Sequence, residues 1–275
     1  MKIKLILLIF FLSFYCTGQE IVKPDDKIES GKPRIIIEKG KSVEERFIPP
    51  AGYKRIQVKE NSFAGYLRTL NLKPFNSPVH YFDGTVKPGK KIYISVVDMD
   101  IDKRDLQQCA DAVMRLRAEY LYGREKYSEI HFNFISDGKP RFYSDYVKGD
   151  ISYKKFRKYM RYIFSYANTS SLYDELVPVS DMNKMKIGDI FIQKGTPYGH
   201  AVIVVDMAES SSTGNKVYLL AQSYMPAQET QILINPMDDL ISPWYELNKK
   251  TVRTPEWTFK PGDLRRFKDI IQGEI

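Results

Sequence analysis

The chain has 275 residues, of which 43% are hydrophobic, 13% aromatic and 28% charged. This composition supports a sizeable hydrophobic core and excludes disordered, collagen-like and solenoid chains. The formal net charge is +8, an excess too small to require a nucleic-acid partner, and we expect none. With only two cysteines, Cys16 and Cys109, the chain can form one disulfide at most.

Residues 1–18 have the pattern of a secretory signal peptide. Lys2 and Lys4 precede an almost unbroken apolar run at 5–15, and small residues follow it. The run is about half the length of a transmembrane helix, and no later apolar stretch approaches that length. We therefore expect an exported protein, periplasmic or extracellular, without a transmembrane segment after signal cleavage. An uncleaved anchor and a lipoprotein acylated at Cys16 remain as alternatives.

Two further segments follow the predicted signal peptide. Residues 19–46 are polar and rich in Lys and Glu, which indicates an arm with one short strand at 35–37. A single α+β domain is predicted over 47–275. Its strands are expected at 53–58, 79–82, 91–97, 130–135, 189–193, 200–207, 217–225, 231–234 and 257–259.

Helices are predicted at 63–70, 102–122 and 153–167, the first with Ser62 as its N-cap. The helix at 102–122 has an apolar stripe that includes Cys109. Its opposite face carries Arg115, Arg117 and Glu119 and is expected to face solvent.

Cys109 is the cysteine that remains after signal cleavage. A lone thiol in an exported protein is exposed to oxidants, so either burial or chemistry must explain it. A nucleophilic cysteine needs a base, usually histidine. His200 is the strongest candidate because it follows a Gly-containing loop and begins an apolar strand, whereas His80 and His131 are more typical of packed strand residues.

Hairpin arithmetic identifies a partner for His200. The turn between the strands at 200–207 and 217–225 is centred near residue 212, so paired residues sum to about 424. His200 then lies opposite Tyr224, and Gln222 is within the error of the alignment. The amide oxygen of Gln222 can accept a hydrogen bond from the imidazole.

The remaining candidates are less specific. Arg115 and Arg117 could clamp a substrate carboxylate, and Tyr224 is a third candidate for substrate binding. Ser223 and 170–171 lack the Gly-x-Ser-x-Gly sequence of a serine nucleophile. The sequence contains no metal-binding spacing and no Gly-rich phosphate loop, so no metal or cofactor is expected.

Four features occur in order along the chain: Cys109 in a helix, a Gly-Asp-Ile-Phe-Ile strand at 188–192, Gly-His-Ala-Val-Ile-Val-Val at 199–205, and a polar residue one strand later. This order resembles that of the NlpC-type papain-like cell-wall peptidases. The resemblance implies an antiparallel sheet packed against a central Cys-bearing helix, with insertions. It also implies a thiolate nucleophile at Cys109, a base at His200 and an orienting group at Gln222. The usual Asp-Cys-Ser-Gly string is absent, and 91 residues separate the cysteine from the histidine.

A wider resemblance is to the uncharacterised family 4846 among domains of unknown function. It rests on the strings at 105–112, 115–120, 199–202 and 220–228, and it extends through Pro-Trp-Tyr at 243–245 and Thr-Pro-Glu-Trp at 254–257. This family implies no established activity.

Two functions follow as hypotheses. The first is a cysteine hydrolase of the cell envelope, an amidase or peptidase acting on peptidoglycan-type peptides through Cys109 and His200. The second is a non-catalytic binding or structural module in which Cys109 is a core residue. The position of Cys109 relative to His200 and the reactivity of its thiol distinguish them.

Overall fold

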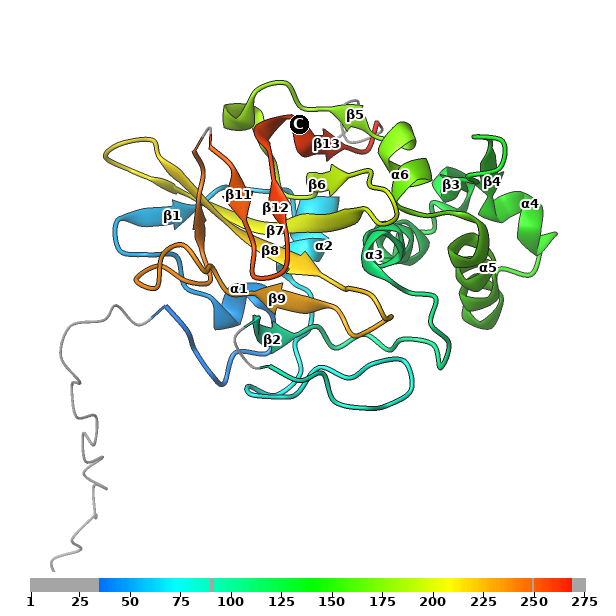
Figure 1. Ribbon diagram of the computed structural model, residues 1–275, viewed down its shortest axis with the longest axis horizontal. Helices are drawn as coiled ribbons and strands as arrows, with labels where there is room; N and C mark the ends of the chain where they lie inside the picture. The colour runs from blue at the N-terminus through cyan, green and yellow to red at the C-terminus, as the bar shows by residue number, and fades with distance from the viewer. Residues whose placement is uncertain (1–34, 90–91, 249, 269–275) are drawn as a thin grey trace, which may run out of the picture. The chain divides into compact units, whose positions relative to one another are not determined.

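The computed structural model describes residues 35–89, 92–248 and 250–268. The predicted signal peptide and Cys16 lie outside them, as does the arm up to residue 34. The described part confirms the α+β class and contains a large antiparallel sheet (Figure 1). The strand order is β2-β9-β8-β7-β6-β13-β5, with β1 paired to β7 and β10 paired to β8. These strands are β1 (Tyr53–Arg55), β2 (Tyr93–Val96), β5 (Val177–Pro178), β6 (Ile190–Gln193), β7 (His200–Ser210), β8 (Lys216–Gln222), β9 (Gln231–Leu233), β10 (Tyr245–Glu246) and β13 (Leu264–Arg266).

Helices and two small hairpins surround this sheet. The hairpins are β3 (His131–Asn133) with β4 (Pro140–Phe142), and β11 (Val252–Arg253) with β12 (Thr258–Phe259). The α-helices are α1 (Val43–Arg46), α2 (Phe63–Arg68), α3 (Cys109–Gly123), α4 (Tyr143–Val147), α5 (Tyr153–Tyr166) and α6 (Thr169–Glu175). Short 3-10 turns occur at Tyr127–Glu129, Met182–Lys184 and Pro261–Asp263.

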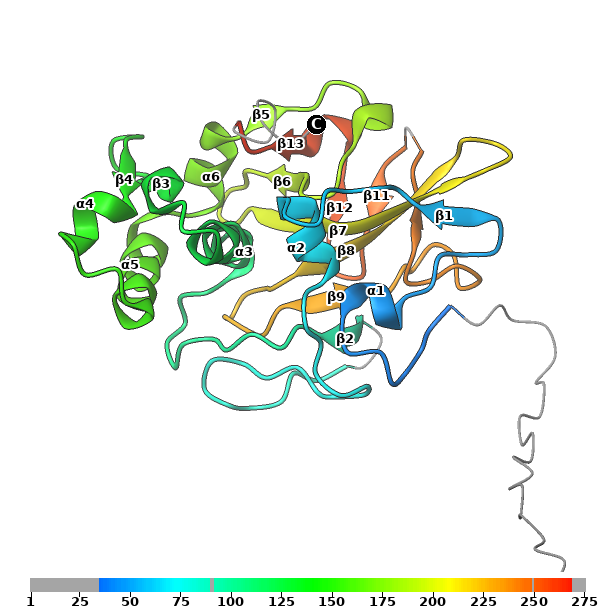
Figure 2. The same ribbon diagram turned by 180° about the vertical axis from the view of Figure 1, so that it is seen from behind.

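The long hairpin of β7 and β8 lies at the centre of the core. Nearly every residue of both strands is buried because other elements cover both faces of the sheet. α2 lies on one face, and the β11–β12 hairpin lies on the other (Figures 1 and 2). On that second face, the ring of Phe259 packs 5.8 Å from the ring of Phe191.

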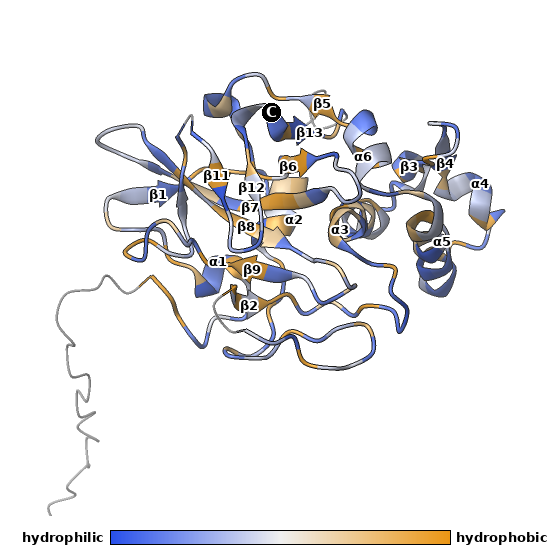
Figure 3. Cartoon of the chain, viewed as in Figure 1, coloured by the Kyte–Doolittle hydropathy of each residue, from blue (hydrophilic) through white to orange (hydrophobic). Residues whose placement is uncertain are grey.

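The hydropathy of the residues in each element agrees with how deeply that element is buried (Figure 3). β6, β7 and β9 are mostly hydrophobic, as expected for strands enclosed on both sides. α5 shows hydrophilic and hydrophobic residues together, because it buries one face only. That face consists of Phe156, Tyr159, Met160, Ile163 and Phe164.

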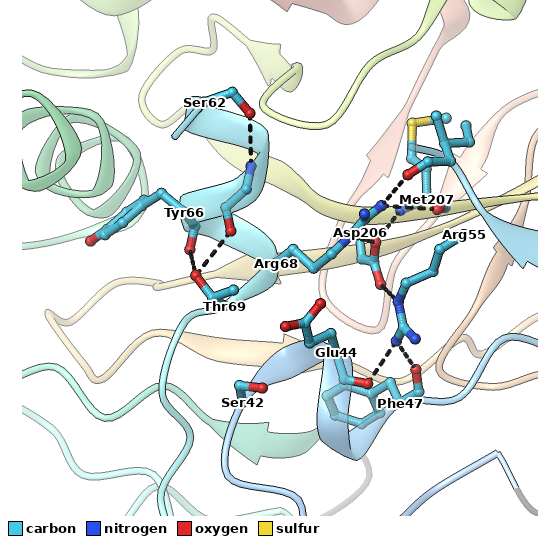
Figure 4. Close-up of polar contacts among 12 residues, drawn as sticks. Ser42, Glu44, Phe47, Arg55, Ser62, Tyr66, Arg68, Thr69, Asp206 and Met207 are labelled. Carbon is cyan, nitrogen blue, oxygen red and sulfur yellow. Dashed lines mark hydrogen bonds and ion pairs between the residues drawn. The ribbon is translucent and has the colours of Figure 1, made fainter. Parts of the chain in front are cut away.

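A buried ion triad fixes the far end of β7 (Figure 4). The carboxylate of Asp206 is fully buried and accepts from Arg55 Nε and Arg68 Nε, each at 2.7 Å. The register of β7 against β8 shifts between Val204 and Asp206, and Asp206 also accepts from the N–H of Met207. The triad therefore ties β1 and α2 to a bulge in the central strand.

The structure differs from the sequence expectations in several places. α3 begins at Cys109 instead of residue 102, because Asp105 accepts hydrogen bonds from the N–H of Ala227 and the side chain of Gln108. The segment 79–82 forms isolated bridges rather than a strand. Ile35 and Val43 belong to the hydrophobic core, so packing begins within the segment expected to be an arm.

Candidate active site around Cys109

Cys109 is the first residue of α3, and the turn before it is held on several sides. Gln108 and Asp111 cap the helix reciprocally. The Ser223 hydroxyl lies 3.2 Å from the carbonyl oxygen of Gln107. Arg115 Nη1 donates to Gln107 Oε1 at 3.1 Å. The loop after β8 and the body of α3 thus fix where the thiol lies.

The thiol faces three chain segments. Cys109 Sγ lies 3.8 Å from Oγ1 of Thr169, the first residue of α6. The backbone amides of Ala201 and Ala110 also interact with the sulfur. The side chain is almost fully buried, yet it lines a cavity of about 160 Å³. The cavity is formed by residues 108–111, 168–170, 194–195, 197–199 and 225.

Burial and the nearby Asp111 carboxyl raise the pKa of the Cys109 thiol. The hydroxyl of Thr169 and the backbone amide of Ala201 act in the opposite direction. Position at a helix N-terminus favours a thiolate, but desolvation is the larger effect here. The resting sulfur is therefore a thiol at neutral pH.

His200 begins β7 and pairs with Gln193 of β6. Its side chain is fully buried among three aromatic rings. The ring centroids of Tyr224, Trp257 and Phe259 lie 4.8, 5.2 and 5.9 Å from that of the imidazole. This packing holds the ring in one orientation.

The predicted partner of His200 lies within hydrogen-bond distance. Ile203 pairs with Ala221 and Val204 with Leu220, so the pairs sum to 424 and the predicted register is confirmed. Oε1 of Gln222 lies 2.9 Å from Nε2 of His200. The other ring nitrogen, Nδ1, is buried and has no hydrogen-bond partner among the described residues.

Burial lowers the pKa of His200 to about 4, with the nearby charge of Lys87 adding to the effect and the Gln222 hydrogen bond opposing it. The imidazole is therefore neutral at pH 7. Neutral thiol and neutral imidazole are the resting forms of this pair, and no hydrogen bond joins them within the described part of the chain.

Behind Gln222 lies a partly buried ion pair, Lys87 with Glu256, that the sequence did not place in the site. Gln222 Nε2 donates to Glu256 Oε2 at 2.6 Å. Lys87 Nζ donates to both oxygens of Glu256, at 2.9 Å each. Glu256 belongs to the Thr-Pro-Glu-Trp string used for the family resemblance, but no pattern linked it to Gln222. No signal in the sequence pointed to Thr169 or Lys87.

Of the predicted substrate contacts, Tyr224 lies against His200, whereas Arg115 and Arg117 do not line the Cys109 cavity. Both arginines are buried rather than solvated. Arg115 donates to Glu119 at 2.6 Å and supports the Gln107 turn. Arg117 stacks on aromatic rings, 4.8 Å from that of Phe63.

The other nucleophile and base candidates are occupied elsewhere. His80 Nδ1 lies 3.1 Å from Glu229, and His131 Nδ1 lies 2.9 Å from the carbonyl oxygen of Glu129. Ser171 caps α6. Ser223 binds backbone carbonyls.

Two classes of feature are absent from the described ranges. No group of three His, Cys, Asp or Glu side chains there could hold a metal ion. No helix in that part of the chain combines the length and apolar composition needed to cross a bilayer.

Fold and site together define an α+β protein with a buried Cys and a buried His–Gln pair at the end of its central hairpin. The family model for the domain of unknown function 4846 matches residues 43–266, so the chain belongs to this family. No curated protein and no solved structure matches the chain.

Proposed function

We propose that this protein is an exported cysteine hydrolase of the cell envelope that cleaves amide bonds in peptidoglycan-type peptides. One observation carries the proposal: the backbone amide of Ala201, the residue next to His200, interacts with Cys109 Sγ, while Nδ1 of His200 has no hydrogen-bond partner among the residues that the structure describes. A nucleophile, a neutral base and a residue that orients the base thus come from α3, β7 and β8. This order is also what a papain-like fold would use.

The neutral resting pair requires the proton to move as the substrate is attacked. Cys109 would turn from Thr169, and Nδ1 of His200 would take the thiol proton as Sγ bonds to the amide carbon. The C–N bond then breaks, and the imidazolium returns the proton to the leaving amine. Water next attacks the thioester while His200 accepts one of its protons. The C–S bond then breaks, the acid is released, and the imidazolium returns the proton to the Cys109 sulfur.

Substrate and location are part of the same proposal. The predicted signal peptide supports export to the periplasm or the cell exterior, and acylation at Cys16 is the alternative mode of retention. Lys194 lines the cavity and offers a cation to the carboxylates of peptidoglycan peptides, although it also pairs with Asp174 at 2.5 Å.

A non-catalytic envelope module is the second candidate. It is favoured by the burial of Cys109, which is 3% exposed, and by the raised pKa of its thiol. In this case Cys109 fills a core site next to Thr169.

The test is to incubate the protein with peptidoglycan digests and isolated stem peptides in ¹⁸O-labelled water and to follow the products by mass spectrometry. We expect cleavage and ¹⁸O incorporation by the wild type, and neither by Cys109→Ala or His200→Gln. Ser144→Ala, at an exposed site on α4 that does not line the cavity, should retain activity. If folded wild-type protein neither cleaves these peptides nor forms a thioester with an activated ester, the non-catalytic module is the better description.

A further inference from the structure

We propose that Glu256, held by Lys87, is a positioning residue that fixes the tautomer of His200 by dictating which way the amide of Gln222 points. The inference deepens the proposed hydrolase, because it explains how the base is kept ready. It rests on a continuous polar chain from Lys87 through Glu256 and Gln222 to His200, built from the contacts described above.

The donors and acceptors along this series of polar side chains, from Lys87 to His200, can be assigned one by one. An ionised carboxylate can only accept hydrogen bonds, so Gln222 must present its NH₂ group to Glu256. The amide oxygen of Gln222 must then face His200, which agrees with the 2.9 Å contact between Oε1 and Nε2. An amide oxygen also accepts only, so Nε2 carries the proton. Nδ1 is consequently the nitrogen with the free lone pair.

Burial prevents water from replacing the hydrogen-bond partners in this arrangement. His200 and Gln222 are almost completely enclosed, so neither can exchange a partner for bulk water. The side chain of Lys87 is 4% exposed, and that of Glu256 is 18% exposed. Without Glu256, the amide of Gln222 could rotate by half a turn and offer its NH₂ group to Nε2. The imidazole would then carry its proton on Nδ1, where it could not accept one from Cys109.

Lys87 has a separate role, which is to hold the carboxylate of Glu256. It binds both oxygens of Glu256 and so locks the carboxylate in place. The positive charge of Lys87 also balances the carboxylate of Glu256, so the carboxylate does not favour protonation of the imidazole. Lys87 Nζ lies 5.5 Å from the ring centroid of Tyr224, which packs against His200. The pair therefore sets orientation without converting the base into its conjugate acid.

The test is ¹⁵N–¹H long-range NMR of the histidine rings at pH 7, which distinguishes the two neutral tautomers. The chain has three histidines, and loss of one signal in His200→Gln assigns His200. We expect the wild type to show Nε2–H only. Glu256→Gln should lose this single pattern and show Nδ1–H as well, whereas Glu246→Gln, the same change at an exposed site on β10, should not.

A double variant tests whether the effect passes through Gln222. In a Gln222→Met background, adding Glu256→Gln should change the tautomer ratio no further. A wild type with Nδ1–H, an unchanged tautomer in folded Glu256→Gln, or an added effect in the Gln222→Met background would each overturn the proposal. A wild-type His200 that carries its proton on Nδ1 overturns the proposal even if the Glu256 variant does not fold.

The hydrolytic rate separates this proposal from the proposed function. Where peptide cleavage is observed, Glu256→Gln should slow it in proportion to the lost fraction of the Nε2–H tautomer, and by about 10²–10⁴-fold, the usual contribution of a general base, if that tautomer is lost completely. A tautomer that depends on Glu256 in a protein that forms no thioester would refute the hydrolase and leave the positioning role. Peptide cleavage with a tautomer independent of Glu256 would do the reverse.

Discussion

Oε1 of Gln222 lies 2.9 Å from Nε2 of His200, across the hairpin that forms the centre of the sheet. This contact replaces only part of the water that the imidazole loses on burial, and the net result is a ring that is hard to protonate. The consequence is a measurable link between pH and stability.

We expect His200 to destabilise the fold as the pH falls from about 6.5 to about 4. Its folded pKa is about 4, and an unfolded imidazole titrates near 6.5. Between these values the unfolded chain binds the extra proton, so the free energy of unfolding falls with decreasing pH, by about 3 kcal/mol across the window. Urea unfolding at several pH values measures this.

Two variants test this prediction. His200→Gln should flatten the dependence of unfolding free energy on pH between 4 and 6.5. Ile151→Val, at an exposed site with no titrating group, should leave the dependence unchanged. Parallel curves for wild type and His200→Gln would contradict the low pKa of the buried imidazole.

The Cys109 thiol should react slowly with iodoacetamide at neutral pH. Because burial raises the pKa of this thiol, the midpoint of the alkylation rate against pH should lie above about 8.5, the value for an ordinary thiol. Thr169→Val removes a hydroxyl that lowers this pKa, and should shift the profile to still higher pH. The rate is followed by mass spectrometry on a Cys16→Ser chain. A midpoint below 8.5 in the wild type would show a preformed thiolate instead.

Gly199→Ala should destabilise the fold because there is no space for a side chain before His200. A Cβ atom there would lie 2.2 Å from the carbonyl oxygen of Gln193 and 2.9 Å from Cγ2 of Thr169. Backbone must move to relieve the clash, and we expect a loss of about 2–4 kcal/mol in unfolding free energy.

Gly123→Ala is the matched variant for this clash. A Cβ atom at Gly123 meets nothing within 4 Å, and the residue ends α3. It should be neutral or stabilising by up to about 1 kcal/mol in thermal or urea unfolding. Equal effects of the two alanines would argue against close packing at the start of β7.

The sequence predicted the parts of the site that depend on local geometry. Strand periodicity and a single turn determine which residues of a hairpin face each other, so counting placed Tyr224 opposite His200, with Gln222 within the error of the alignment. The start of α3 could not be found this way. Asp105 resembles a helix cap, but it bonds to the N–H of Ala227, 122 residues further along the chain.

Glu256 and Arg115 show the same limit. Glu256 reaches Gln222 only because the β11–β12 hairpin folds over the sheet, which no local pattern encodes. Arg115 was expected on a solvated face, but Tyr153 of α5 and Glu119 surround it. Periodicity identifies the apolar face of a helix, whereas burial of a charged face depends on what later packs there.

Asp206→Asn should be among the most destabilising single substitutions in this chain. The carboxylate is fully buried and compensates both Arg55 and Arg68, which also hold backbone carbonyl oxygens of Phe47 and Ile56. Loss of its charge leaves two guanidinium groups without their counter-ion, and breaking a buried pair typically costs about 3–5 kcal/mol. Asp137→Asn breaks an exposed ion pair with Arg141 and should cost far less, because solvent screens that pair. Urea unfolding of the two variants side by side measures the difference. A loss of unfolding free energy for Asp206→Asn no larger than that for Asp137→Asn would show that the triad does not hold β1 and α2 to the central strand.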